Sequence, residues 1–335
     1  MKLTPGKLAG LNAVSNARGV IAAAAMDQRG SLQKSIAAER GGVVDPESLV
    51  EFKTLVTEVL TRHASAILLD PEYGLEAAKN RNDAGLLLAY EKTGYDSSTP
   101  GRLPDLLDDW SVRRLVEAGA DCIKVLLYYS PFEKTSINDR KHAWVERIGD
   151  ECLANDIPFF LESVGYDMDG GGEKTIEYAR RKPSIVSGSM AEFGKERYNV
   201  DVLKVEVPIE MAFVEGTHAY KGIAAYTREQ ALQHFRDAEQ MTHKPFIYLS
   251  AGVSNPVFIE TLALAAESGT KFNGVLCGRA TWKDGVPIFA KNGPAAFREW
   301  LETVGVENIS RVNEALEAAT PWRLKYENGG DADIV

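Results

Sequence analysis

The 335-residue sequence lacks the motifs of several large enzyme classes. Its five histidines show none of the HxH, HxxxH or HExxH spacings that are typical of metal sites. No GxGxxG segment opens a helix after the first apolar run, and the chain has no Walker loop and no GxSxG elbow. We therefore predict that the protein uses no metal ion and no other cofactor.

The sequence is also poor in cysteine and in long apolar runs. Cys122, Cys152 and Cys277 are widely spaced and form no CxxC pair, so we expect reduced structural thiols in a cytoplasmic protein. No segment approaches the roughly 18 consecutive apolar residues of a membrane span. The N-terminus lacks the apolar core of a signal peptide. We expect no membrane partner.

The sequence has fewer basic than acidic residues. Its 38 lysines and arginines and 48 aspartates and glutamates give a formal net charge of −10. This balance argues against a nucleic-acid partner. It does not specify the substrate. A homo-oligomer, either a dimer or a tetramer, is expected only because such assemblies are common.

Apolar runs of strand length alternate with helix-like stretches along the chain. This pattern predicts a single-domain (β/α)8 barrel over residues 1–320 and a polar tail over 321–335. A doubly wound open sheet is the alternative, weakened by the missing GxGxxG segment. The loop 167–173 holds three consecutive glycines and is predicted to be mobile. The predicted strands are 19–27, 65–74, 84–92, 120–130, 157–166, 201–208, 244–252 and 272–280. The main predicted helices cover about 45–63, 106–118, 137–155, 173–197, 227–241, 255–268, 292–303 and 309–318.

The segment DVLKVEVP, residues 201–208, is unusual for a buried parallel strand because two charged residues interrupt it. Side chains alternate along a strand, so Lys204 and Glu206 are expected on the same face. Burying a lone ammonium is costly, which favours the neutral, nucleophilic amine. Such an amine forms a Schiff base with a carbonyl. The alternative is a structural lysine–glutamate pair.

Other charged residues lie at the ends of further predicted strands, where a barrel carries its chemistry. Strands four, five and six are neighbours in a barrel, so Lys124, Glu162 and Lys204 are expected to meet. A second ammonium near Lys204 would favour its neutral form, and Glu162 would then be placed for proton transfer. Asp27 ends the first strand and is either a further acid or a turn former.

A phosphate site is expected after strands seven and eight, where barrels often bind phosphate. Gly252 and Gly278 let the backbone approach a ligand closely, Ser250 adds a hydroxyl and Arg279 adds a fork of donors. The alternative is that these glycines only turn the chain. Gln28 and Arg29 follow Asp27, and Arg29 is a candidate for a second anionic group across the mouth unless it forms a surface salt bridge.

With these residues identified, the chain resembles the class I tagatose 1,6-diphosphate aldolases, a family of metal-free (β/α)8 barrels that act through a Schiff base. The resemblance runs from residue 26 to 282, and it is weaker over 180–198 and 215–225 and at the C-terminal tail. It rests on MDQRG (26–30), SAILLDPEYGL (65–75), AGLLLAYEKTGYD (84–96), RLPDLLDDWSVRRLVEAGAD (102–121), VERIGDECLANDIPFFLE (145–162), DVLKVEVP, YLSAGVS (248–254) and FNGVLCGRATW (272–282).

The resemblance implies a role for each candidate residue. Lys204 is the expected Schiff-base lysine and Glu162 the expected acid/base, with Lys124 and Asp27 as supporting residues. The implied reaction cleaves a phosphorylated ketose, tagatose 1,6-bisphosphate, to dihydroxyacetone phosphate and glyceraldehyde 3-phosphate. Either Glu162 or Asp27 deprotonates the C4 hydroxyl. The expected phosphate and substrate contacts are Gln28, Arg29, Ser250, Gly252, Gly278 and Arg279.

Two other functions fit the same barrel. A phosphosugar isomerase or epimerase would need an acid/base pair but no essential lysine. A non-catalytic sugar-phosphate sensor would have no need of Lys204, Lys124 and Glu162. Within the aldolases, a relative acts on a sulfonated ketose phosphate, so the distal anionic group and the accepted C3 and C4 epimers, such as fructose 1,6-bisphosphate, stay open.

Overall fold

The computed structural model describes residues 2–93 and 99–327, which fold into a closed barrel of eight parallel strands. Each strand pairs with the next, and β8 pairs with β1 through Ile21 opposite Gly274. This closure confirms the predicted (β/α)8 barrel and excludes the open sheet. The strands are β1 Ile21–Ala25, β2 Ala66–Leu69, β3 Gly85–Ala89, β4 Cys122–Tyr128, β5 Phe159–Val164, β6 Val202–Val205, β7 Phe246–Leu249 and β8 Gly274–Cys277.

The strands form because their residues are apolar on both faces, as expected where helices cover a parallel sheet. One face packs against the helices. The other fills the barrel interior with side chains such as Leu68, Leu87, Phe160 and Ile247. These interior residues build layers, and the charged residues lie in the layers above them, toward the strands' carboxyl ends. The three cysteines are free and buried, as predicted.

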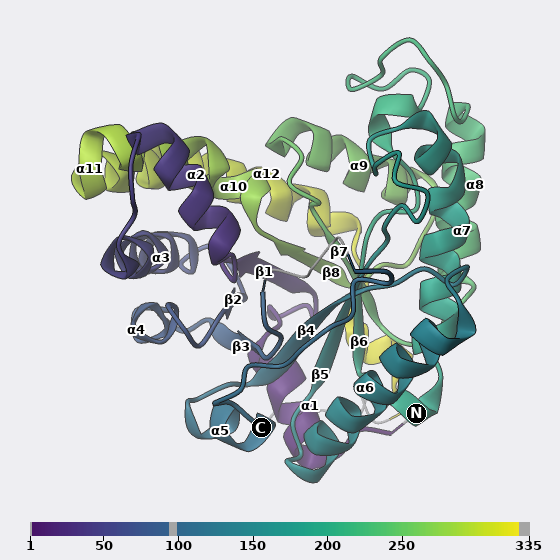
Figure 1. Ribbon diagram of the computed structural model, residues 1–335, viewed down its shortest axis with the longest axis horizontal. Coiled ribbons are helices and arrows are strands. Elements are labelled where there is room, and N and C mark those ends of the chain that lie inside the picture. The colour runs from purple at the N-terminus through teal and green to yellow at the C-terminus, as the bar shows by residue number, and fades with distance from the viewer. Residues whose placement is uncertain (1, 94–98, 328–335) are drawn as a thin grey trace.

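Helices surround the barrel, with α2, α3 and α11 on one side and α6, α7 and α8 on the other (Figure 1). None of those in residues 2–93 and 99–327 is long and apolar enough to cross a membrane. The helices are α1 Pro5–Ala13, α2 Gly30–Arg40, α3 Pro46–Leu60, α4 Leu75–Ala78, α5 Val112–Glu117, α6 Thr135–Ala154, α7 Ile176–Phe193, α8 Arg228–Glu239, α9 Asn255–Glu267, α10 Arg279–Trp282, α11 Val286–Trp300 and α12 Val306–Ala315.

Some predicted helix boundaries were wrong. The helix predicted over 106–118 begins only at Val112, because the Ser111 hydroxyl accepts a hydrogen bond from the Arg114 N–H and caps it there. Leu106 instead forms a β-bridge with Glu91. The helix predicted over 292–303 begins at Val286 and is kinked at Gly293, whose φ is +84°. Helices α1, α2 and α10 were not predicted.

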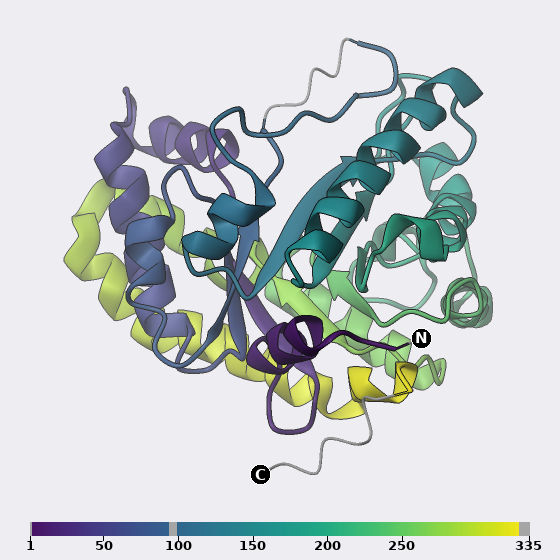
Figure 2. The same cartoon turned by 90° about the horizontal axis from the view of Figure 1, so that it is seen from below.

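Helix α1 and residues 321–327 cover the N-terminal end of the barrel. Helix α1 and the short helix Trp322–Lys325 lie beside each other there (Figure 2). The Trp322 indole donates to the Ser15 hydroxyl, and the Lys7 ammonium pairs with Asp201 at 2.8 Å. Residues 321–327 of the predicted tail therefore pack on the barrel. The rest of that tail lies outside the described residues.

Candidate active site

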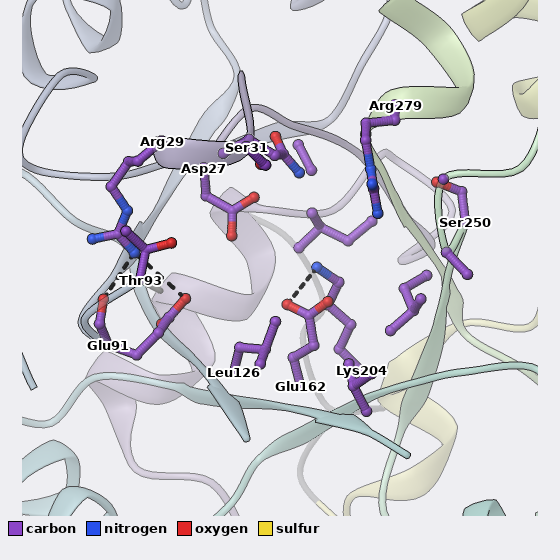
Figure 3. A pocket seen from close by; sticks show the side chains of 18 of the residues that line it. Asp27, Arg29, Ser31, Glu91, Thr93, Leu126, Glu162, Lys204, Ser250 and Arg279 are labelled. Carbon is purple, nitrogen blue, oxygen red and sulfur yellow. Dashed lines mark hydrogen bonds and ion pairs between the residues drawn. The ribbon is translucent and has the colours of Figure 1, made fainter. Parts of the chain in front are cut away.

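A cavity of about 610 Å³ opens at the carboxyl ends of the strands, and most of the predicted site residues line it. Figure 3 shows Asp27 and Glu162 pointing into the middle, Arg29 and Glu91 on one side, and Lys204, Ser250 and Arg279 on the other. The predicted site residues that line the cavity are Asp27, Gln28, Arg29, Glu162, Lys204, Ser250, Gly252, Gly278 and Arg279.

Lys204 and Glu162 are opposite each other on the paired strands β6 and β5. Residues in register on parallel strands point to the same side, so both side chains enter the barrel. The Lys204 Nζ lies 2.8 Å from Glu162 Oε2, and the Lys124 Nζ lies 2.8 Å from the same oxygen. Both contacts are ion pairs. The predicted meeting of the three residues is confirmed.

Lys124 is fully buried and lies among three carboxylates rather than on the cavity wall. Its Nζ lies 2.8 Å from an oxygen of Asp27, of Glu91 and of Glu162. Glu91 was not predicted as a site residue, although it follows an apolar run in the same way as Asp27. Burial lowers the pKa of Lys124, but the three carboxylates more than offset this and raise the pKa well above its usual value. Lys124 is therefore a fixed cation.

The three carboxylates differ in their tendency to hold a proton. Burial raises the pKa of Asp27 and of Glu162, but the ammonium groups of Lys124 and Lys204 outweigh it, so both pKa values are lowered. Burial dominates at Glu91, whose pKa is raised despite Lys124 and Arg29. The site thus keeps two ionised carboxylates and one that accepts a proton more readily. The sequence argument for a neutral Lys204 considered only burial and like charge, and it omitted the opposite charge of Glu162.

The predicted phosphate residues gather on the Lys204 side of the cavity. Gly252 has a φ of +75°, and a Cβ there would lie 2.7 Å from the Arg279 Cζ, so the guanidinium rests against this backbone. The N–H groups of Ala251 and Gly252 have no acceptor in residues 2–93 and 99–327. No carboxylate in the same ranges pairs with Arg279. These donors are free to bind an anion.

Arg29 lies on the opposite wall, and its guanidinium is already engaged. One Nη contacts Glu72 at 2.6 Å, and the other donates to the Glu91 carbonyl at 2.8 Å. The salt bridge considered for Arg29 is therefore present, with a buried arginine and an exposed glutamate. Helix α2 begins at the next residue and brings Ser31 and Lys34 to the cavity. Neither residue was singled out in the sequence, because a short polar helix start carries no distinctive pattern.

Glu206 lines the same cavity as Lys204, as the alternation of strand residues predicted. The Glu206 carboxylate accepts a hydrogen bond from the Gly165 N–H at 2.7 Å and lies 3.4 Å from the ammonium of Lys182 on α7. The structural lysine–glutamate pair at this strand therefore involves Lys182, and Lys204 is left to face Glu162.

The loop after β5 contacts Arg102, which lines the cavity. The Asp167 carboxylate accepts a hydrogen bond from the Gly172 N–H at 2.8 Å and pairs with Arg181, which ties the glycine-rich segment to α7. Arg102 pairs with Glu173 at 2.9 Å and lies over the ring of Tyr128. The predicted mobility of this loop stays a prediction.

The fold and the site together define a (β/α)8 enzyme with a lysine–carboxylate cluster at its active-site mouth. Residues 21–284 match the model of the DeoC/LacD family aldolases, and the chain belongs to this family. It is an aldolase, a lyase. The isomerase and sensor alternatives are thereby superseded.

Relatives that match over the full length carry a common name. The chain is 54% identical over 329 residues to tagatose 1,6-diphosphate aldolase 2 of Enterococcus faecalis, covering 98% of each chain. It is 49% identical over 337 residues to tagatose 1,6-diphosphate aldolase of Listeria monocytogenes, covering 100% of this chain and 99% of the relative. The resemblance inferred from the sequence is confirmed.

A solved structure shares the fold. The fructose-bisphosphate aldolase of Plasmodium falciparum, solved in complex with TRAP and an inhibitor, superposes with a TM-score of 0.67 at 16% identity and covers 98% of both chains. At this identity the likeness concerns the fold alone.

Proposed function

We propose that this aldolase cleaves D-tagatose 1,6-bisphosphate to dihydroxyacetone phosphate and D-glyceraldehyde 3-phosphate through a Schiff base on Lys204. The observation that carries the proposal is the contact of Lys204 Nζ with Glu162 Oε2 at 2.8 Å, inside a cavity with anion donors on the same side. The substrate follows from the names of the relatives.

Glu162 is the proton carrier for imine formation. Its carboxylate touches the Lys204 ammonium, so it removes the proton that keeps this amine from attacking the C2 ketone. The same acid then protonates the departing hydroxyl as carbinolamine becomes iminium. Lys124, fixed as an ammonium, stabilises Glu162 between these steps and keeps it ionised in the free enzyme.

Asp27 is assigned to the carbon–carbon bond. It points into the space between the Lys204 side and the Arg29 side of the cavity (Figure 3). A carboxylate there accepts the proton of the C4 hydroxyl while the C3–C4 electrons flow into the iminium. Glyceraldehyde 3-phosphate leaves, the enamine is protonated at C3, and water releases dihydroxyacetone phosphate. Burial raises the pKa of Asp27, but the neighbouring ammonium groups outweigh it and lower the pKa, so Asp27 is ionised and its carboxylate is open to a proton.

The two phosphates take opposite walls of the cavity. The C1 phosphate lies near Lys204, where the N–H groups of Ala251 and Gly252 and the Arg279 guanidinium donate to it. The C6 phosphate lies at the start of α2, where Ser31 and Lys34 line the cavity. Arg29 contributes positive charge there, since Glu72 and Glu91 occupy its Nη groups.

The reaction is proposed to need no metal ion. The place where three carboxylates converge is already filled by the Lys124 ammonium, at 2.8 Å from each. The electron sink that a Lewis acid provides in other aldolases is supplied here by the iminium.

The experiment is a cleavage assay that follows dihydroxyacetone phosphate release. Tagatose 1,6-bisphosphate, fructose 1,6-bisphosphate and a sulfofructose 1-phosphate are compared at equal concentration. The proposal predicts turnover of tagatose 1,6-bisphosphate, and the rate with fructose 1,6-bisphosphate shows whether its C4 epimer is also accepted. Preference for the sulfonated ketose would reassign the distal site to a sulfonate. No cleavage of any of the three would remove the proposed substrate class.

A further inference from the structure

Lys53 is a fully buried lysine that the proposed reaction does not use. It lies on α3, outside the barrel wall, with no exposed surface. Its Nζ donates to the carbonyl of Met26 at 2.7 Å, to the carbonyl of Gln28 at 2.8 Å and to Asp70. A buried ammonium with three acceptors satisfies all its donors, so the desolvation of its charge is compensated.

The two carbonyls are those on either side of Asp27. Strand β1 ends at Ala25, whose carbonyl accepts a hydrogen bond from the Trp282 indole at 2.9 Å. The Met26 N–H still donates to the Leu68 carbonyl of β2 at 2.7 Å, but the carbonyls that follow Ala25 need donors from outside the sheet. Lys53 supplies donors to the residue before Asp27 and to the residue after it. The backbone that carries the Asp27 carboxylate is therefore fixed from behind.

Asp70 extends the same network toward the cavity. The Asp70 carboxylate, fully buried at the end of β2, accepts hydrogen bonds from the N–H groups of Glu72 and Tyr73 at 3.1 and 2.8 Å. The Glu72 carboxylate then pairs with Arg29, which donates to the Glu91 carbonyl. One buried pair thus determines the backbone position of Asp27 and, through Glu72, the position of Arg29.

We propose that the Lys53–Asp70 pair is a positioning device for Asp27, acting on the carbon–carbon cleavage step and not on imine formation. The inference rests on the proposed function, because it concerns the step assigned to Asp27. It follows from the hydrogen bonds to Met26 and Gln28, since a carboxylate must be held in position to accept a proton in the transition state. Lys204 and Glu162 lie on β6 and β5 and do not contact Lys53.

The test is the double substitution Lys53→Met with Asp70→Asn. Removing both charges avoids leaving one of them buried and unpaired. An asparagine still accepts the N–H groups of Glu72 and Tyr73, while methionine cannot donate to Met26 and Gln28. The expected result is a kcat lower by about 10–100-fold with KM changed less than threefold, which is the effect of a misplaced catalytic group.

The matched control is Lys7→Met with Asp201→Asn. This buried pair lies at the other end of the barrel, and Asp201 likewise accepts a backbone hydrogen bond, from the Phe159 N–H at 2.9 Å. Both double variants are compared by circular dichroism and thermal unfolding. The control is expected to keep the parent kcat even where its stability falls by a similar amount.

A second arm separates positioning from general support. In an Asp27→Asn background, the Lys53 and Asp70 substitutions should lower kcat no further, because the residue they position no longer accepts a proton. In the Lys53→Met/Asp70→Asn variant with Asp27 intact, borohydride trapping of the imine with dihydroxyacetone phosphate should proceed at the parent rate. An equal extra loss in the Asp27→Asn background, or a kcat equal to the parent, would overturn the positioning role.

If the double variant does not fold, Lys53→Gln provides the measurement. Glutamine is shorter and neutral but keeps two donors, so it satisfies Asp70 while losing at least one of the two carbonyls. A kcat at least fivefold lower supports the proposal, and an unchanged kcat contradicts it. Absence of cleavage and of a borohydride adduct in the parent would instead overturn the proposed function, so the two failures are distinguishable.

Discussion

Glu162 and Lys204 stand opposite each other on neighbouring strands, and the Glu162 carboxylate lies 2.8 Å from the Lys204 ammonium and from the Lys124 ammonium. One oxygen between two lysines, of which only Lys204 lines the cavity, divides the pair into a reactive amine and a fixed cation. The assignments of Glu162 and Asp27 follow from this arrangement.

Glu162→Gln and Asp27→Asn should fail at different steps. Each is expected to lower kcat for cleavage by about 10²–10⁴, the usual range for an acid/base group. Glu162→Gln should also slow imine formation with dihydroxyacetone phosphate, because glutamine cannot take the Lys204 proton. Asp27→Asn should form the imine at the parent rate. Rapid-quench borohydride trapping measures this, and the same imine rate in both variants would contradict the division of roles.

Lys124→Met should move the acid limb of the kcat/KM profile to higher pH. Asp27 and Glu162 both have lowered pKa values because ammonium groups outweigh burial, so the parent's acid limb lies below the ordinary carboxyl range near 4. Loss of the adjacent positive charge raises both pKa values. Lys92→Met is the control, since Lys92 lies at the cavity rim and pairs with Asp108. A limb that moves equally in both variants would contradict the account.

The lowered pKa values of Asp27 and Glu162 should also affect how stability depends on pH. Because the folded pKa values of Asp27 and Glu162 lie below their unfolded values, their contribution to stability is complete above about pH 4.5. It is lost as the pH falls through the lowered folded values. Urea unfolding of Asp27→Asn/Glu162→Gln should therefore show a weaker loss of stability between about pH 4.5 and 2 than the parent. Parallel pH curves for the two proteins would show that the two groups are not perturbed.

Dialysis against a strong chelator should leave the activity unchanged, since Lys124 occupies the position between the three carboxylates. The assay compares the dialysed enzyme with enzyme supplemented with zinc and with magnesium. Activity that disappears on dialysis and returns with zinc would mean that a metal ion, and not the iminium, is the electron sink for C3–C4 cleavage.

Gly252→Ala should raise KM and weaken inhibition by inorganic phosphate. The φ of Gly252 is +75°, and the new Cβ would lie 2.7 Å from the Arg279 Cζ, which displaces the guanidinium from the proposed C1 phosphate site. Gly269→Ala is the matched control, because its φ is +81° but its Cβ would meet no atom within 4 Å. Both should lose about 1 kcal/mol of stability from the strained backbone. A phosphate affinity that falls equally in both would remove the site.

The sequence predicted the barrel and the meeting of Lys124, Glu162 and Lys204, because parallel strands in chain order bring their carboxyl ends together. Glu91 could have been predicted by the same argument, since it follows an apolar run as Asp27 does. Lys53 was not, because a lysine in an amphipathic helix normally faces water. Its burial depends on how α3 packs against residues 26–28. The engagement of Arg29 by Glu72 likewise required the positions of two loops in space.

The most direct test of the account is the identity of the lysine that forms the imine. Borohydride added with dihydroxyacetone phosphate should inactivate the enzyme irreversibly, and peptide mass mapping should place the reduced adduct on Lys204. Lys204→Ala should abolish both adduct and cleavage, while Lys124→Met should slow adduct formation without abolishing it. An adduct on Lys124 would reverse the two roles. Undiminished cleavage with no adduct on any lysine would contradict the Schiff-base mechanism.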